Sequence, residues 1–170
     1  GMAMRLLPEP IIQVVDPDTG ASVGPGETGE VVVTNDSRLY PLIRFGTGDL
    51  AMNIDPRPGE SAQAERAIIL VGRRGEAVKV RGMFLHPNQL RFAAAQVPGI
   101  GAVQAVVTRP DGVRDHLALR VAAAEGVDQA ALAEGLKGAV QGVCRVRVDE
   151  VGFGEITDGA PPVVDGREWG

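Results

Sequence analysis

The sequence predicts an α+β protein in which a small antiparallel β subdomain is followed by a ferredoxin-like α/β sandwich. Two observations support this fold class. β-Branched runs broken by Gly and Pro turns fill the first part of the chain, and amphipathic helical stripes occur only after them. The 170 residues, 44% of them hydrophobic, are enough for one medium domain or two small ones. We expect the division at residues 1–73 and 74–170.

The first part is expected to be a sheet without helices. Short β-branched runs between turn residues predict strands at Ile11–Val15, Glu30–Thr34, Leu42–Phe45 and Ala67–Val71. A Pro- and Gly-rich loop at residues 55–60 separates the last two. Because nothing in this part could cover the sheet with a helix, we expect it to be a piece of something larger.

In the second part, patterns typical of helices alternate with patterns typical of strands. Arg81-Gly82 between two short apolar runs predicts a hairpin, and Pro87 opens a helix that Pro98-Gly99 ends. Two alternating strands follow, and Asp128 caps a second helix. Cys144, Val146 and Val148 are expected to form a last strand. The order strand, helix, strand, strand, helix, strand is that of a ferredoxin-like sandwich.

Composition excludes several classes of function. A net charge of -5 and 4% aromatic residues argue against a nucleic-acid surface. Without a membrane-length apolar run or a secretory signal, we expect a cytoplasmic protein with no membrane partner. The single cysteine, Cys144, allows neither an internal disulfide nor a cysteine metal cluster, and no metal site is predicted. Basic residues do concentrate between Gly72 and Arg91, where they could serve phosphates.

Two motifs carry more information than the fold. Residues 41–50 read Pro-Leu-Ile-Arg-Phe-Gly-Thr-Gly-Asp-Leu, and residues 72–87 read Gly-Arg-Arg-Gly-Glu-Ala-Val-Lys-Val-Arg-Gly-Met-Phe-Leu-His-Pro. In this order and separation they resemble the adenylate-forming superfamily of acyl-CoA synthetases, and the phenylacetate-CoA ligases in particular. Gly29–Thr34 also resembles the strand that precedes the first motif in that family.

The resemblance implies the C-terminal portion of an AMP-forming acyl- or aryl-CoA ligase. Residues 1–73 would end the large N-terminal domain, and residues 74–170 would form the mobile C-terminal domain. Such enzymes join a carboxylic acid to ATP, releasing pyrophosphate, and then pass the acyl group from AMP to coenzyme A. ATP or AMP, coenzyme A and the acid are therefore the expected ligands, with Mg²⁺ accompanying ATP. The rest of the N-terminal domain would be a missing partner, and this fragment alone should be inactive.

The resemblance assigns roles to residues near the first motif and the domain boundary. Asp49 is expected to accept hydrogen bonds from two ribose hydroxyls, although a turn-capping role is the alternative. Arg73 is expected to hold ribose or phosphate, or else to be a solvated surface arginine. Gly75 stands where relatives often have a hinge aspartate, and it is expected to act as the hinge. Gly46 replaces an arginine that is common in the superfamily.

The segment after the hinge is expected to serve thioester formation. Lys79 and Arg81 could attract coenzyme A phosphates, with a solvated strand face as the alternative. Gly82 could let the backbone approach the substrate or pantetheine tunnel, or it could simply be a hairpin glycine.

One catalytic group is missing. Related ligases carry a lysine near the C-terminus that neutralises charge during adenylation. The corresponding stretch here, residues 158–169, contains no lysine. The only lysines are Lys79 and Lys137, and neither stands in the expected place. We therefore assign no catalytic residue, and adenylation would need Arg167 or an upstream residue as a substitute. Two alternatives remain: a degenerate relative that binds nucleotides or CoA esters, and a ferredoxin-like interaction or regulatory module.

Overall fold

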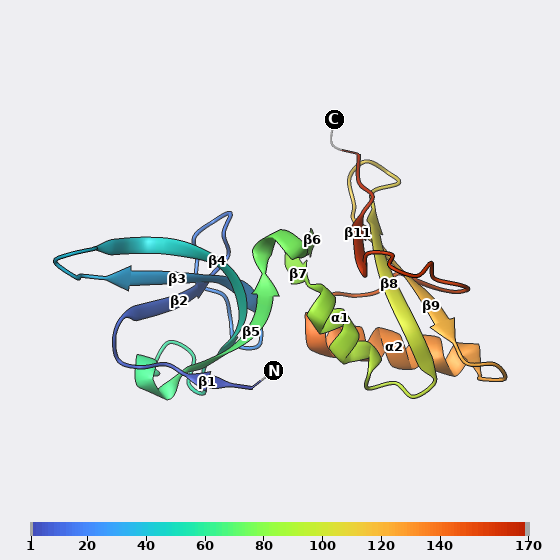
Figure 1. Cartoon of the computed structure of the whole chain (residues 1–170), viewed down its shortest axis with the longest axis horizontal. Coiled ribbons are helices and arrows are strands. Elements are labelled where there is room, and N and C mark those ends of the chain that lie inside the picture. The colour runs from blue at the N-terminus through green and yellow to red at the C-terminus, as the bar shows by residue number, and fades with distance from the viewer. Residues whose placement is uncertain (1, 169–170) are drawn as a thin grey trace. The chain divides into compact units, whose positions relative to one another are not determined.

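A computed structural model describes residues 2–168, which form two compact units that divide after Glu76 (Figure 1). Each unit has its own cluster of buried apolar side chains. All the α-helix of the described chain lies in the second unit, and both units contain sheets. The α+β class is therefore confirmed. The division lies close to Arg73, where we expected the domain boundary.

The first unit is a five-stranded antiparallel sheet with strand order β1-β5-β4-β3-β2. Its strands are β1 (Met4–Arg5), β2 (Ile11–Val15), β3 (Thr28–Asn35), β4 (Leu42–Ile54) and β5 (Ala67–Arg73), with short 3₁₀ turns at Gln63–Glu65 and Arg74–Glu76. The four strands predicted here are confirmed. Strand β4 is much longer than expected and contains the whole first motif after Pro41.

Strand β4 bulges in the middle of that motif. The pairing with β3 places Val32 opposite Gly46 and Glu30 opposite Leu50. Three residues of β4, Thr47 to Asp49, thus face the single residue Val31. A bulge of this kind bends a strand and redirects its side chains, and such bulges are common beside active sites.

The second unit is a four-stranded sheet with two helices and a separate hairpin. The elements are β6 (Val78–Val80), β7 (Met83–Leu85), α1 (Pro87–Ala94), β8 (Ile100–Thr108), β9 (His116–Ala123), α2 (Gln129–Cys144), β10 (Glu150–Phe153) and β11 (Val163–Asp165). Strands β8 and β9 are antiparallel, while β10 runs parallel to β9 and β11 parallel to β8. Both helices lie beside this sheet in Figure 1, and their apolar faces contribute to its core.

The order of strands and helices in the second unit agrees with the prediction, but the strands pair differently from those of a ferredoxin-like sheet. The first strand is not a member of the main sheet, because β6 pairs only with β7 in a two-stranded hairpin. The sheet order is β10-β9-β8-β11, in which β11 is an additional edge strand. Periodicity showed which side chains are buried, whereas partners depend on long-range contacts that a local pattern does not contain.

The prediction of a last strand at residues 144–148 is wrong. Cys144 ends α2, Arg145 adopts a left-handed conformation with φ 59°, and strand β10 begins only at Glu150. Val146 and Val148 are buried as the alternation suggested, but their segment pairs in no ladder. Burial raises the pKa of the Cys144 thiol to about 12, which agrees with a packing role.

Local capping explains where the helices of the second unit begin. Buried His86 accepts a hydrogen bond from the Asn88 N–H at 3.0 Å, and Pro87 occupies the first turn of α1. Asp128 caps α2 through the N–H groups of Ala130 and Ala131. Within residues 2–168, no helix is long and apolar enough to cross a membrane.

The exposed segment between the units gives a first testable prediction. Residues 73–76 are solvent-exposed, and trypsin can cleave after Arg73 and Arg74. Limited digestion followed by mass spectrometry should therefore cut here first and leave a stable fragment that begins near Gly75. Loss of every stable fragment after this cut would show that the second unit does not fold by itself.

Candidate functional site

Asp49 and Arg73, the two residues predicted to contact a nucleotide, lie side by side in the first unit. They are direct partners in the β4–β5 pairing, and Asp49 Oδ1 lies 2.7 Å from Arg73 Nη1. The Asp49 and Arg73 side chains remain 38% and 65% exposed, respectively. A carboxylate and a guanidinium that are paired yet accessible can together bind a ligand that carries both hydroxyl and phosphate groups.

The bulge directs the Asp49 side chain. Gly48 adopts φ 77°, a conformation that favours glycine, and an added Cβ there would lie 3.8 Å from Arg73 Nη2. The Thr47 hydroxyl donates to the Val31 carbonyl at 3.0 Å and accepts from the Asp49 N–H at 3.2 Å. Thr47 therefore caps this turn, while the Asp49 carboxylate turns toward Arg73.

Glu30 is a member of this site that sequence reasoning missed. Its side chain is 10% exposed, accepts the Gly48 N–H at 3.1 Å and pairs with Arg74 at 3.0 Å. Gly46 provides the necessary space, because an added Cβ would lie 2.8 Å from Glu30 Oε1. The available signal was a carboxylate inside a Val-rich strand, a position where charge is costly unless it is paired.

Gly75 occupies the 3₁₀ turn that ends the first unit. An added Cβ would meet no atom within 4 Å, so packing does not require glycine at this position. The role of Gly75 as a hinge therefore stays a prediction based on chain freedom.

The other predicted residues, Lys79, Arg81 and Gly82, lie in the second unit on the β6–β7 hairpin. Arg81 and Gly82 form its two-residue turn with φ 48° and φ 85°, as a type I′ turn requires. The Arg81 guanidinium pairs with Asp149 at 2.6 Å and donates to the Arg147 carbonyl. Lys79 Nζ lies 5.6 Å from the ring centroid of Phe84. The turn thus accounts for Gly82, and its approach to a substrate stays a prediction.

Asp115, whose side chain is 9% exposed, connects this hairpin to the end of the described chain. Asp115 accepts the Arg81 N–H at 3.0 Å and the Arg109 guanidinium at 2.8 Å, and it contacts Arg167 Nη1 at 3.2 Å. Burial alone would raise the pKa of the Asp115 carboxyl, but these donors outweigh it and lower the pKa to about 2. Asp115 is therefore ionised at all ordinary pH values.

This network decides the role of Arg167, the substitute cation considered from the sequence. The Arg167 side chain is only 6% exposed. It contacts both Asp115 and Asp165 and donates to the Lys79 carbonyl at 3.0 Å. A guanidinium held by two carboxylates is already neutralised, so Arg167 is a structural residue in this conformation.

A cleft of about 520 Å³ opens beside the Arg81 turn. Arg114 and Arg147 line it together with Arg81, Arg109 and three aspartates. The Arg147 side chain is 76% exposed, so part of the positive charge can reach a ligand. Sequence reasoning missed these arginines because they come from separate segments of the chain.

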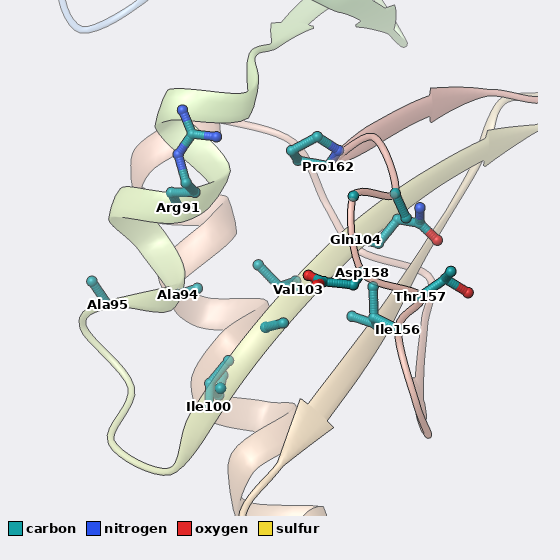
Figure 2. A pocket seen from close by; sticks show the side chains of 14 residues that line it. Arg91, Ala94, Ala95, Ile100, Val103, Gln104, Ile156, Thr157, Asp158 and Pro162 are labelled. Carbon is teal, nitrogen blue, oxygen red and sulfur yellow. The ribbon is translucent and has the colours of Figure 1, made fainter.

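A second pocket, of about 500 Å³, lies between α1, the first half of β8 and residues 156–162 (Figure 2). Its lining is mostly apolar, and Arg91 and Asp158 are its charged members. Residues 156–162 form one side of the pocket, with Asp158 in the middle of the view. Across residues 2–168, no group of three or more His, Cys, Asp or Glu side chains is placed to hold a metal ion.

Comparisons with known proteins identify this architecture. No family model matches the sequence. The phenylacetate-coenzyme A ligases of Thermus thermophilus and Aromatoleum evansii are 29% and 27% identical over 114 and 110 residues, or 66% and 64% of this chain. A solved 2-hydroxyisobutyryl-CoA ligase in an open conformation, in complex with 2-HIB-AMP and CoA, matches 91% of this chain with 29% identity and a TM-score of 0.62.

The chain thus resembles phenylacetate-CoA ligases and a solved acyl-CoA ligase. It spans about a quarter of the length of the curated relatives and 36% of the solved ligase. In the thioesterification state, that ligase matches 92% of this chain with a TM-score of 0.52. The resemblance to phenylacetate-CoA ligases found in the two motifs is therefore confirmed.

Proposed function

We propose that this chain provides the ribose-binding strands and the hairpin-bearing domain of an AMP-forming acyl- or aryl-CoA ligase. Such a protein activates a carboxylic acid with ATP and transfers the acyl group to coenzyme A. The observation that carries this proposal is the accessible Asp49–Arg73 pair on the β4 bulge, formed by residues from both sequence motifs. Residues 1–73 would close the large domain, and residues 74–170 would be the mobile one, with Gly75 as the hinge.

The chemistry of the pair suits the nucleotide part of ATP and AMP. Two carboxylate oxygens of Asp49 can accept from two ribose hydroxyls, and one of them already lies against Arg73. The Arg73 guanidinium carries additional donors for a ribose or phosphate oxygen. Mg²⁺ would arrive on the ATP phosphates.

Coenzyme A would be bound from the second unit. Lys79, Arg81 and Gly82 lie on the hairpin, and the adjoining cleft adds Arg114 and Arg147. Arg81 is already paired with Asp149, so a phosphate would have to share this guanidinium. The exposed Arg147 is the stronger candidate for direct phosphate contact.

A mutation of Asp49 tests the nucleotide proposal. In the full-length protein, Asp49→Ala should weaken AMP and ATP binding by about 1–3 kcal/mol, because it removes hydrogen bonds to a charged group. Isothermal titration calorimetry measures this change. Glu65→Gln is the matched control, since it breaks an exposed ion pair with Arg57 elsewhere in the same unit.

Unchanged AMP and ATP affinity in a folded Asp49→Ala protein would remove the basis of the proposed function. The thermal midpoint of the variant should stay close to that of the parent, because the pair is exposed and such pairs contribute little to stability.

A degenerate nucleotide- or CoA-ester-binding relative is the second candidate function. One observation favours it: the segment at residues 156–162 carries no lysine, and Arg167 is buried against two carboxylates. Pyrophosphate exchange driven by a carboxylic acid distinguishes the two candidates, because only a working ligase forms the acyl-adenylate reversibly.

A further inference from the structure

Glu30 is a buried, charged residue that lies beside the Asp49–Arg73 pair but is not itself expected to contact the ribose. Glu30 as a whole residue is 7% exposed, and it lies in β3 between buried neighbours. Burying a carboxylate costs free energy unless charged or polar donors compensate. Each Glu30 oxygen has one such donor, and the two donors come from different parts of the site.

The first donor is the backbone of the bulge. Three residues of β4 face only Val31, so they cannot all pair with the backbone of β3. Glu30 Oε1 accepts the Gly48 N–H at 3.1 Å and so takes the place of a ladder carbonyl. Since Gly48 immediately precedes Asp49, this hydrogen bond constrains the direction of the ribose-binding carboxylate.

The absence of a side chain at residue 46 makes this arrangement possible. A Cβ at Gly46 would lie 2.8 Å from Glu30 Oε1 and 3.3 Å from its carboxyl carbon. Any larger residue would push the carboxylate away from Gly48. Glu30 can therefore reach the Gly48 N–H only because residue 46 is a glycine.

The second donor lies at the end of the first unit. Glu30 Oε2 contacts Arg74 Nη1 at 3.0 Å, and the preceding Arg73 contacts Asp49 at 2.7 Å. Two consecutive arginines are thus attached to the first unit by two carboxylates. We therefore expect the freedom of the chain to increase after them, from Gly75 on.

We propose that Glu30 is a positioning residue that fixes the Asp49 bulge with one oxygen and the Arg74 end of the inter-unit segment with the other. In this way the ribose site and the start of the hinge share a single buried carboxylate. The effect on nucleotide affinity rests on the proposed function, whereas the effect on bulge and segment geometry does not.

Three variants separate the two contacts. Glu30→Gln keeps an acceptor for Gly48 but loses the charge that holds Arg74. Arg74→Met leaves the Gly48 contact intact, and Glu30→Ala removes both contacts. Gly46→Ala displaces the carboxylate without removing it, and it replaces Glu30→Ala if that protein does not fold. Glu65→Gln again serves as the control for a surface ion pair.

The geometric measurement uses amide hydrogen exchange and ¹⁵N relaxation by NMR on the 170-residue chain. The Gly48 amide should exchange about tenfold faster or more in Glu30→Ala and Gly46→Ala, and it should stay near the parent rate in Glu30→Gln and Arg74→Met. The Gly75 amide should become more mobile in Glu30→Gln, Arg74→Met and Glu30→Ala. An unchanged Gly48 exchange rate in both Glu30→Ala and Gly46→Ala would overturn the proposal.

The functional measurement uses AMP affinity of the full-length protein. Affinity should fall about tenfold in Glu30→Ala and largely recover in Glu30→Gln, which a purely stabilising role would not produce. Equal losses in both variants, or no loss when Gly48 exchange has risen, would refute positioning. If Asp49→Ala itself leaves affinity unchanged, the proposed function fails, and the exchange rates alone then decide the role of Glu30.

Discussion

Replacing Asp115 by asparagine should lower the free energy of unfolding of the second unit by about 3 kcal/mol. This is the scale for removing one partner of a buried ion pair and leaving the other uncompensated. The Asp115 and Arg167 side chains are 9% and 6% exposed, and both Arg109 and the Arg81 backbone also depend on this carboxylate. Stabilities of small domains are about 5–15 kcal/mol, so a large fraction would be lost.

Urea unfolding followed by helical circular dichroism measures this loss, because both α-helices belong to the second unit. Asp111→Asn is the matched control in the same loop. Asp111 is exposed and only accepts the N–H groups of Val113 and Arg114, which asparagine can also do. A double variant with Arg167→Met should be less destabilised than the sum of the single changes. If Asp115→Asn and Asp111→Asn unfold alike, the network contributes nothing to stability.

The same carboxylate predicts how stability depends on pH. Its pKa is lowered in the folded protein from 3.8 to about 2, so its contribution is complete above about pH 4 and is lost as the pH falls toward 2. The shift corresponds to about 2 kcal/mol. The parent protein should therefore lose more stability than Asp115→Asn between pH 4 and pH 2.

Adenylation by the full-length protein should be about 10² to 10³-fold slower than in a relative that carries the C-terminal lysine, the scale for one missing charge-stabilising donor. Arg167 cannot replace this lysine in the conformation described, because two carboxylates already hold it. Thioester formation should survive, since by resemblance it uses the Lys79–Pro87 segment instead. The protein should convert a pre-made acyl-adenylate and coenzyme A to acyl-CoA, while its acid-dependent pyrophosphate exchange stays slow.

Pro161→Lys tests this explanation by adding a cation. Pro161 is exposed, and its carbonyl accepts from the Gln104 side chain at 2.9 Å, a contact that any residue can keep. Some pyrophosphate exchange should return in Pro161→Lys but not in the neutral control Pro161→Met. Rapid exchange by the unmodified protein would contradict the proposed defect and indicate a cation from another part of the protein.

Most strands, both helices and the β6–β7 hairpin could be predicted because local patterns determine them. β-Branched runs bounded by Gly and Pro mark strands, and Arg81-Gly82 supports the positive φ values that a two-residue turn requires. Asp49 and Arg73 could be selected because each stands in a specific motif. The alternation around Val146 predicted burial correctly but not a strand, since burial does not supply a partner.

The α+β class and the resemblance to phenylacetate-CoA ligases could be recognised from the chain alone, because local periodicity and short motifs are contained in neighbouring residues. The folded units add three contacts that the sequence did not indicate: Asp49 pairs with Arg73, Glu30 pairs with Arg74, and Asp115 pairs with Arg167. These contacts join residues 24, 44 and 52 positions apart. Strand register and burial bring such residues together, and both arise from the packing of the whole unit rather than from any one segment.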